Sequence, residues 1–382
     1  MRQIGQHGSA CVKIRAMRIS FPYTFWLLLV ALLLGGCSDL SYCVQCVRGQ
    51  LEVMAQTRPI EEVLQDSRIS EAERRQLTKV LAIRTFAVER LGLPDNDSYR
   101  LYADIGRPFV VWNVVATPEF SLAPKQWCYP VVGCVAYRGY FNADEARAMG
   151  AELAAQGFDV DVYGVKAYST LSWFDDPVLN TFIDGADSQL ASLIFHELAH
   201  QVVYVKDDCS FNEAFAKTVE REGLRRWLEA NSTQAEWQGY LDREARSEEF
   251  LALLAWTRDQ LAGLYAQPLS DAEKRAAKRD ILARLGDELR SQRARWPNPA
   301  AIDGWLGRGL NNARLTSTAT YYDRVPAFEA VLDAQRGDLP AFYEEVARLA
   351  ALPAAERTAR LKAYGQIEVA AVCNDQPGDA QR

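Results

Sequence analysis

Two short segments organise this chain: residues 194–201, Ile194-Phe195-His196-Glu197-Leu198-Ala199-His200-Gln201, and residues 212–216, Asn212-Glu213-Ala214-Phe215-Ala216. The first segment places two histidines four residues apart, with a glutamate beside the first of them. Residues at this spacing share one face of a helix, so both imidazoles can bind the same ion. The pattern is typical of zinc sites that activate water for hydrolysis.

The predicted zinc site needs a third ligand that is not a histidine. The chain has three histidines, and the third, His7, lies in an N-terminal segment that we expect to be removed. Twelve residues separate His200 from Glu213, enough chain to return a second helix against the first. Two histidines and one glutamate are a known catalytic set. Asp207 and Asp208 are the competing ligands, but we interpret them as loop and capping residues. The predicted ligands of one zinc ion are therefore His196, His200 and Glu213.

The predicted chemistry follows from this ion. Zinc lowers the pKa of a bound water to about 7 and polarises a carbonyl. Glu197 is then placed to take the proton of the water and deliver it to the leaving amine. A tyrosine is the natural donor to the oxyanion, because the mature chain has no spare histidine. The candidates, whose alternative role is packing, are Tyr321 and Tyr322 first and Tyr168 next, with Asn212, Asn311 and Asn312 around the site.

The N-terminus has the pattern of a lipoprotein signal peptide. The apolar run Phe25–Leu34 is ten residues long, too short to span a bilayer. It ends in Leu34-Gly35-Gly36-Cys37, which resembles a bacterial lipobox. We predict a signal peptide over residues 1–36, with Met17 as an alternative true start, and a lipid on Cys37 that tethers the chain to the membrane. An ordinary secretory signal or an uncleaved anchor is the alternative. Ser38 favours the outer over the inner membrane of a bacterial envelope, with the chain facing the periplasm.

Eight cysteines become informative if the chain is exported, because an oxidising compartment permits disulfides. Cys128 and Cys134 flank a turn-like spacer and are the predicted disulfide pair. Cys43 and Cys46 form a CxxC pair, which we interpret as structural because no thioredoxin-like pattern surrounds it. The remaining mature cysteines have no deducible pairing.

Bulk composition indicates a globular chain without nucleic-acid affinity. Of 382 residues, 49% are hydrophobic and 24% are charged. The net charge is −7, and the 50 acidic and 43 basic residues are interspersed without a basic block. We therefore predict no nucleic-acid partner.

The element pattern predicts an α+β fold that is mainly α-helical, with a small β-sheet before the histidine helix. We expect a single metallopeptidase domain over residues 37–382. Ser70 with Glu73 forms a capping box that opens a helix to about residue 91. The parts of this domain are a helical segment 40–95, a small sheet over 105–170, zinc-site helices over 187–230 and a helical segment 232–370, in which 232–295 reads as one long charged helical run.

Together the two motifs resemble the gluzincin metallopeptidases, in particular aminopeptidase N-like enzymes. The whole mature chain is similar to the bacterial putative aminopeptidase family, often found as predicted lipoproteins. The stretches that carry this similarity are 127–128 through 139–141, 168–177, the two zinc motifs and 311–328. The resemblance implies a zincin-like fold and zinc peptidase activity on peptide or protein substrates. It also implies that the ligands are His196, His200 and Glu213, and that Glu197 is the catalytic carboxylate.

Two departures from aminopeptidase N-like enzymes are visible. The spacer before the ligand glutamate is shorter, and we find no GAMEN-type strand for the substrate amine. If an amine is bound, carboxylates must bind it, and Asp175 and Asp176 are candidates whose alternative role is to cap the turn before Pro177. Rival functions are a lipoprotein with a structural zinc that acts through partners, and a non-peptidic zinc hydrolase.

Overall fold

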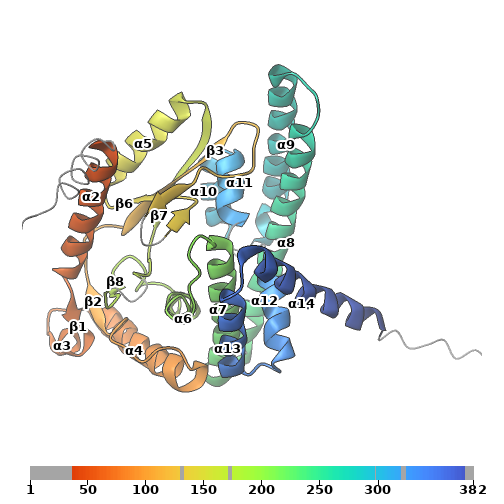
Figure 1. Ribbon diagram of the computed structural model, residues 1–382. Coiled ribbons are helices and arrows are strands. Elements are labelled where there is room, and N and C mark those ends of the chain that lie inside the picture. The colour runs from red at the N-terminus through yellow and green to blue at the C-terminus, as the bar shows by residue number, and fades with distance from the viewer. Residues whose placement is uncertain (1–36, 130–132, 171–173, 297, 320–323, 375–382) are drawn as a thin grey trace, which may run out of the picture. The chain divides into compact units, whose positions relative to one another are not determined.

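The computed structural model describes residues 37–129, 133–170, 174–296, 298–319 and 324–374 (Figure 1). The chain separates into two compact units, with the boundary between Arg48 and Gly49. The predicted signal peptide lies outside the described residues, and the single domain over 37–382 stays a prediction. None of the described helices combines the length and the apolar character needed to cross a membrane.

The N-terminal helices are α2 (Cys37–Met54), α3 (Ile60–Gln65) and α4 (Glu71–Leu91). The predicted cap at Ser70 is confirmed at α4, because the Ser70 hydroxyl accepts a hydrogen bond from the Glu73 amide at 3.1 Å. The helix ends at Gly92, whose φ of 67° is the left-handed conformation typical of a helix C-terminus. One face of α4 is buried and packs against the histidine helix.

Three small sheets stand where a single sheet was expected. The first has the order β1-β2-β8 (Arg58–Pro59, Leu101–Ala103, Val178–Leu179), and the second has the order β6-β3-β7 (Arg138–Tyr140, Val111–Pro118, Phe158–Val165). The third pairs β4 (Trp127–Tyr129) with β5 (Gly133–Val135). Helix α5 (Ala143–Ala155) packs against β3 and β7, and Asn142 is its N-terminal cap.

The two zinc-motif helices are α6 (Asp187–Ala199) and α7 (Cys209–Asn231), and they form the centre of the main hydrophobic core. They pack closely because α7 carries Gly223 at the crossing. A Cβ atom at this position would lie 2.8 Å from Leu91 and 2.9 Å from Phe195, which is closer than real contacts allow. The glycine therefore permits an approach that holds the second motif beside the first.

The charged run over 232–295 is helical as predicted, but it is divided into two helices, α8 (Gln234–Tyr265) and α9 (Asp271–Ser291). Each helix opens with its own capping box, at Thr233 and at Ser270. These two helices pack on each other around a second hydrophobic cluster. The remaining elements are the 3-10 turn η1 (Arg293–Arg295) and the helices α10 (Pro299–Gly307), α11 (Asn312–Ala319), α12 (Val325–Ala334), α13 (Leu339–Ala350) and α14 (Ala354–Asn374).

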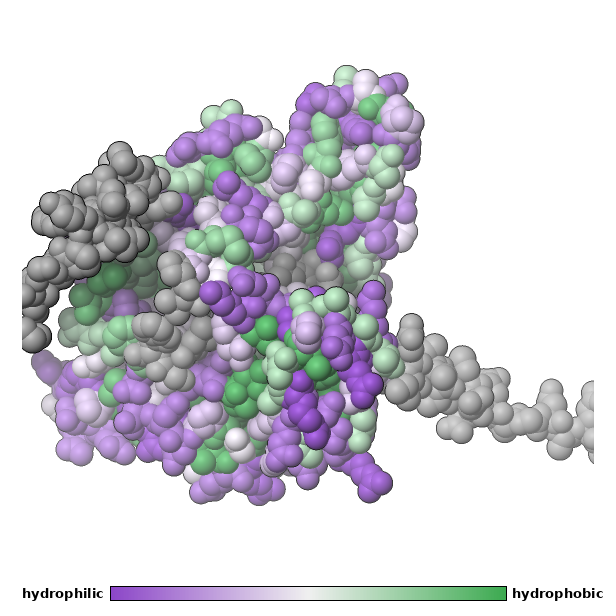
Figure 2. Space-filling view, viewed as in Figure 1, coloured by the Kyte–Doolittle hydropathy of each residue, from purple (hydrophilic) through white to green (hydrophobic). Residues whose placement is uncertain are grey.

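The described residues are thus mainly helical with small sheets, consistent with the predicted α+β class. On the face shown in Figure 2, hydrophilic residues cover most of the periphery and apolar residues lie between them. This distribution agrees with the interspersed charges of the sequence.

Candidate metal centre

The two motif histidines lie at the C-terminal end of α6, where their rings converge. The buried face of this helix, formed by residues such as Leu190, Ile194 and Leu198, fixes its rotation against the core. His196 lies in the last turn and His200 is the C-terminal cap. Their Nε2 atoms are 3.2 Å apart, and the ring planes meet at 84°. The four-residue spacing therefore does bring both imidazoles to one point.

The loop between the two helices is pinned by Asn212. Its side-chain oxygen accepts a hydrogen bond from the Val205 amide, and its side-chain nitrogen donates to the Val205 carbonyl, both at 2.8 Å. The cap of α7 is Asp208, which accepts from the Phe211 amide at 3.2 Å, so the interpretation of Asp208 as a capping residue is confirmed. Asn212 thus sets the path by which the chain returns Glu213 to the histidines.

Glu213 completes a cluster that can hold a metal ion. Its Oε2 atom lies 3.4 Å from Nε2 of His196 and 3.8 Å from Nε2 of His200. Tetrahedral ligands about 2.0–2.2 Å from a zinc ion lie roughly 3.3–3.6 Å from one another. The same Oε2 is buried and has no hydrogen-bond partner among the residues that the structure describes. Within the described part of the chain, His196, His200 and Glu213 form one group whose ligand atoms lie within 4.8 Å. The donor set, the spacing and the orphaned oxygen all fit a zinc ion.

Without a metal ion, the pKa values of the two histidines shift in opposite directions. Burial opposes the charged form of His196, but the neighbouring carboxylates of Glu213 and Glu220 outweigh it and raise the pKa of His196 to about 10. Burial lowers the pKa of His200 to about 4. Burial also opposes ionisation of Glu213, yet His200 and His196 outweigh it and hold that pKa below its ordinary value. In the absence of a metal ion, the proton on His196 therefore compensates the negative charge of Glu213. A bound metal ion would neutralise that charge instead.

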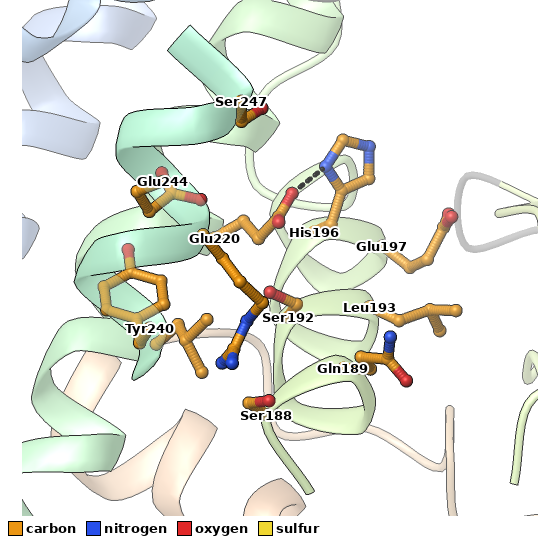
Figure 3. Close-up of a pocket in the computed structure, with 12 residues that line it drawn as sticks. Ser188, Gln189, Ser192, Leu193, His196, Glu197, Glu220, Tyr240, Glu244 and Ser247 are labelled. Atoms are coloured by element: carbon orange, nitrogen blue, oxygen red, sulfur yellow. Dashed lines mark hydrogen bonds and ion pairs between the residues drawn. The ribbon is translucent and has the colours of Figure 1, made fainter. Parts of the chain in front are cut away.

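Glu220 supports the first histidine from behind, a role that sequence reasoning missed. Its carboxylate lies 3.1 Å from Nδ1 of His196 and 2.7 Å from the Lys217 ammonium. Burial opposes its charge, but Lys217 and His196 lower the pKa of Glu220 to about 2. An ionised carboxylate only accepts, so Nδ1 of His196 donates to Glu220 (Figure 3) and Nε2 faces Glu213.

Glu197 is not among the ligands and lies on the other side of His196 from Glu220 (Figure 3). It lines a pocket of about 470 Å³ that also includes His196. Burial raises the pKa of Glu197 to about 7, and the nearby charges of Glu213 and Asp176 act in the same direction. A carboxylate with a pKa near neutrality, facing a pocket, can both accept and return a proton.

Further tyrosines that were not among the predicted donors lie within electrostatic reach of Glu197 or Glu213: Tyr99, Tyr137, Tyr163 and Tyr204. Tyr99 is buried, its hydroxyl has no hydrogen-bond partner in the described part of the chain, and its φ of 63° is rare for a side chain of this size. Burial and then Glu197 raise the pKa of Tyr99. Burial, Cys209 and Glu213 raise the pKa of Tyr137. Sequence carries no signal for either, because the fold alone brings them near. Tyr321 and Tyr322 lie outside the described residues.

The loop candidates are engaged within the fold. Asp176 is buried, accepts hydrogen bonds from the Thr170 amide at 3.0 and 3.1 Å, and its own carbonyl accepts from the Tyr99 amide at 2.6 Å. Asp175 is exposed. The Tyr168 hydroxyl donates to the Gln50 side chain. A substrate role for these residues stays a prediction.

Asn311 and Asn312 connect α11 to the central sheet. The Asn311 amide donates to the Val160 carbonyl at 2.8 Å. The Asn312 side chain donates to the carbonyls of Glu119 and Ser121, both at 2.9 Å. These side-chain amides are engaged by backbone carbonyls, and no described contact places them at the metal centre. Their predicted position around the metal stays a prediction.

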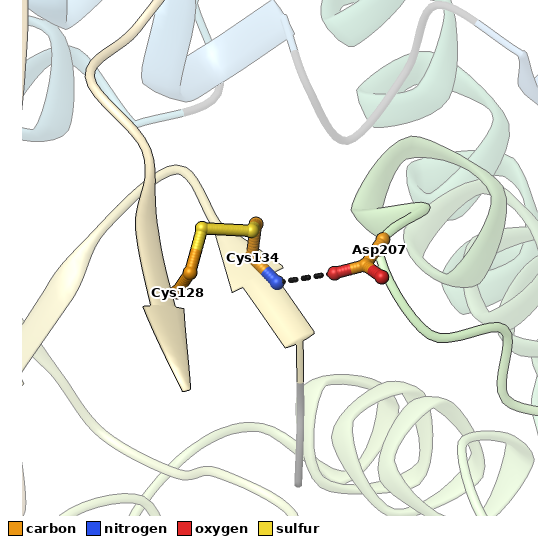
Figure 4. Close-up of a disulfide and its surroundings, with 3 residues drawn as sticks. All are labelled: Cys128, Cys134 and Asp207. Carbon is orange, nitrogen blue, oxygen red and sulfur yellow. Dashed lines mark hydrogen bonds between the residues drawn. A yellow bond between two sulfur atoms is a disulfide. The ribbon is translucent and has the colours of Figure 1, made fainter. Parts of the chain in front are cut away.

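Cys128 and Cys134, the predicted pair, form a disulfide that closes the β4–β5 hairpin. The Cys134 amide donates to the Asp207 carboxylate at 2.5 Å, so the hairpin is tied to the loop between the two motif helices (Figure 4). The free cysteines of the described residues are Cys43, Cys46 and Cys209. The Cys37 side chain is outside the described set.

One protein family matches the chain, and its description is "Putative aminopeptidase". The match extends over residues 41–361 and therefore includes α6, α7 and the whole ligand cluster. Comparisons with curated proteins and with solved structures returned no match. Because the matched region covers well over half of the sequence, the chain belongs to this putative aminopeptidase family.

Proposed function

We propose that this protein is a zinc-dependent metallopeptidase of the gluzincin type with a zincin-like domain, and that it acts as an aminopeptidase. The observation that carries the proposal is the convergence of three ligand atoms within 4.8 Å, from His196, His200 and Glu213. Structural zinc sites use four protein ligands, whereas catalytic sites use three and leave one position open. The described residues provide three, and Glu197 stands beside them without being needed as a ligand.

The chain's own residues have distinct roles in this proposal. When bound, zinc supplies Lewis acidity, which polarises a carbonyl and makes a water acidic. Glu197 accepts a proton from the attacking water and returns it to the leaving amine. Glu220 fixes the ring of His196 through Nδ1, which keeps Nε2 aimed at the cluster. The hydroxyl donor to the oxyanion is a tyrosine. The candidates are the predicted Tyr321 and Tyr322, together with Tyr137 and Tyr99.

We also propose that a lipid on Cys37 tethers the mature chain to a bacterial envelope, facing the periplasm and favouring the outer membrane. The lipobox-like ending of the apolar run supports this. The Cys128–Cys134 disulfide is compatible with an oxidising compartment. Metabolic labelling with a fatty acid should mark the wild-type chain and not a Cys37→Ser variant. Equal labelling of both would refute the anchor.

Hydrolysis of a peptide panel tests the enzymatic part. Purified protein should contain about one zinc per chain and release amino acids from unblocked peptides more efficiently than it cuts N-terminally blocked ones. Glu197→Gln should keep the metal and lose hydrolysis by roughly 10²-fold or more. Glu213→Gln should lose both metal and activity, because it removes a ligand.

The panel also separates the rival functions. Zinc binding without hydrolysis of any peptide would favour a structural metal. Turnover of esters or non-peptide amides, with no cleavage of peptides, would favour a non-peptidic hydrolase. Cleavage of blocked peptides only would replace the aminopeptidase with an endopeptidase. Full activity in Glu197→Gln would overturn the mechanism.

A further inference from the structure

A pocket beside the metal centre is lined by His196 and Glu197, but not by His200 or Glu213. It runs along α6 from Ser188 to Glu197 and is closed on the other side by residues of α8, including Tyr240 and Ser247 (Figure 3). Its volume of about 470 Å³ is in the range of sites that hold small organic ligands. A substrate that reaches Glu197 therefore has room to extend along α6, and the groups that line this extension can select among substrates.

The acidic groups of this extension already have cationic partners. Glu220 is 2.7 Å from the Lys217 ammonium and also binds His196. Glu244 is 2.9 Å from the Arg221 guanidinium, which lies outside the pocket lining. Because these carboxylates are compensated from the protein side, they are poorly suited to bind a ligand cation.

Arg243 is different, because its guanidinium has no partner. It lines the pocket, its side chain is exposed, and within the described ranges it makes no hydrogen bond or ion pair. Three serines of the same lining, Ser188, Ser192 and Ser247, likewise have no side-chain hydrogen bond to a described residue. Ser188 also lies in the first turn of α6, where the helix dipole favours negative charge. Among the described residues, the pocket lining thus offers one cation and three hydroxyls that have no partner.

We propose that Arg243 recognises a carboxylate of the peptide substrate, with these serine hydroxyls as additional donors. A guanidinium binds a carboxylate with two parallel, charge-assisted hydrogen bonds, which gives both strength and orientation. This inference rests on the proposed peptidase function and specifies its substrate class: peptides that carry a negative charge at a fixed distance from the scissile bond. The carboxylate belongs either to the peptide C-terminus or to an acidic side chain.

Equilibrium binding to zinc-loaded Glu197→Gln protein tests the proposal without turnover. The probes are trialanine with a free or an amidated C-terminus, and an amidated tripeptide with either aspartate or asparagine in the same position. Adding Arg243→Gln should weaken binding of a carboxylate-bearing peptide by about tenfold or more, the weight of a hydrogen bond to a charged group. The loss should be confined to the peptide that bears the recognised carboxylate. A loss only with the free C-terminus assigns that group, and a loss only with aspartate assigns the side chain.

Arg246→Gln is the matched control, because Arg246 lies one turn further along α8 and is paired with Glu249 at 2.6 Å outside the pocket. It removes the same charge and should leave binding of every probe unchanged. Equal effects of the two arginine variants, or equal losses with the charged and neutral peptides, would overturn the role of Arg243. Because binding is measured in a protein that does not turn over, a failure of peptidase activity in the wild type would be seen separately.

Discussion

Replacing Glu197 with glutamine should stabilise the metal-free protein at alkaline pH. The carboxylate lies in a partly closed pocket, and burial raises its pKa from 4.5 to about 7. A raised carboxyl pKa means that the folded state binds its proton more tightly than the unfolded state does. Ionisation of Glu197 therefore costs stability. The cost is absent below about pH 4.5, grows between the two pKa values and is complete above about pH 7. Glutamine has nearly the same shape and carries no charge.

The expected size follows from the shift. A difference of one pKa unit corresponds to about 1.4 kcal/mol, so the shift of Glu197 from 4.5 to about 7 corresponds to at most about 3.5 kcal/mol in the free energy of unfolding. For a folded unit of this length the entropy of unfolding is roughly 0.7 kcal/mol/K, so the gain in Tm should be at most about 5 °C. The gain should be present at pH 8 and should vanish near pH 4.5.

Thermal unfolding followed by circular dichroism, in the presence of a chelator, measures this difference across the pH range. Glu222→Gln is the matched control on α7, because there Arg225 and Arg226 outweigh burial and lower the carboxyl pKa. That variant should lose stability at neutral pH, with the opposite sign. A Glu197→Gln variant that is no more stable than the wild type at pH 8, or whose gain is the same at every pH, would refute the reasoning.

Two further predictions concern the support of the site. Glu220→Gln should weaken zinc binding by roughly 10–100-fold in a competitive chelator titration, because the glutamine no longer holds Nδ1 of His196 with a charged acceptor; an unchanged affinity would contradict this role. Gly223→Ala should lower the free energy of unfolding by about 1–2 kcal/mol in urea, because the crowding of the α6–α7 crossing outweighs the helix-propensity gain. A more stable variant would show that the crossing can relax.

Local periodicity accounts for the parts of the site that sequence could predict. His196 and His200 meet because a helix repeats its faces every three to four residues, and this geometry depends on no other part of the chain. Glu213 required one added assumption, that the chain turns back after α6. The structure meets it through the Asn212 side chain, which closes the loop on Val205.

Groups that reach the site through tertiary contact were beyond sequence reasoning. Glu220 lies on the α7 face that turns toward His196, and that rotation is decided by the close packing at Gly223. Tyr99 and Tyr137 come from segments before α6, and no local sequence pattern predicts that these segments lie near the cluster. The break between α8 and α9 was different, because Pro268 and the Ser270 capping box mark it in the sequence. That signal was present but was outweighed by the continuous charge pattern.

The electrostatics of the cluster explain why its parts come from rigid, closely packed helices. Glu213 and Glu220 both contact His196, and in the absence of a metal ion the proton on that histidine is what compensates Glu213. A bound dication would take over this task, so metal and proton compete for the same site and affinity should fall as the pH falls. His200 takes no part in the competition near neutral pH, because burial keeps it neutral. Burying these charged groups, and an oxygen that has no hydrogen-bond partner among the described residues, costs conformational stability, and the closely packed α6 and α7 hold the groups in place.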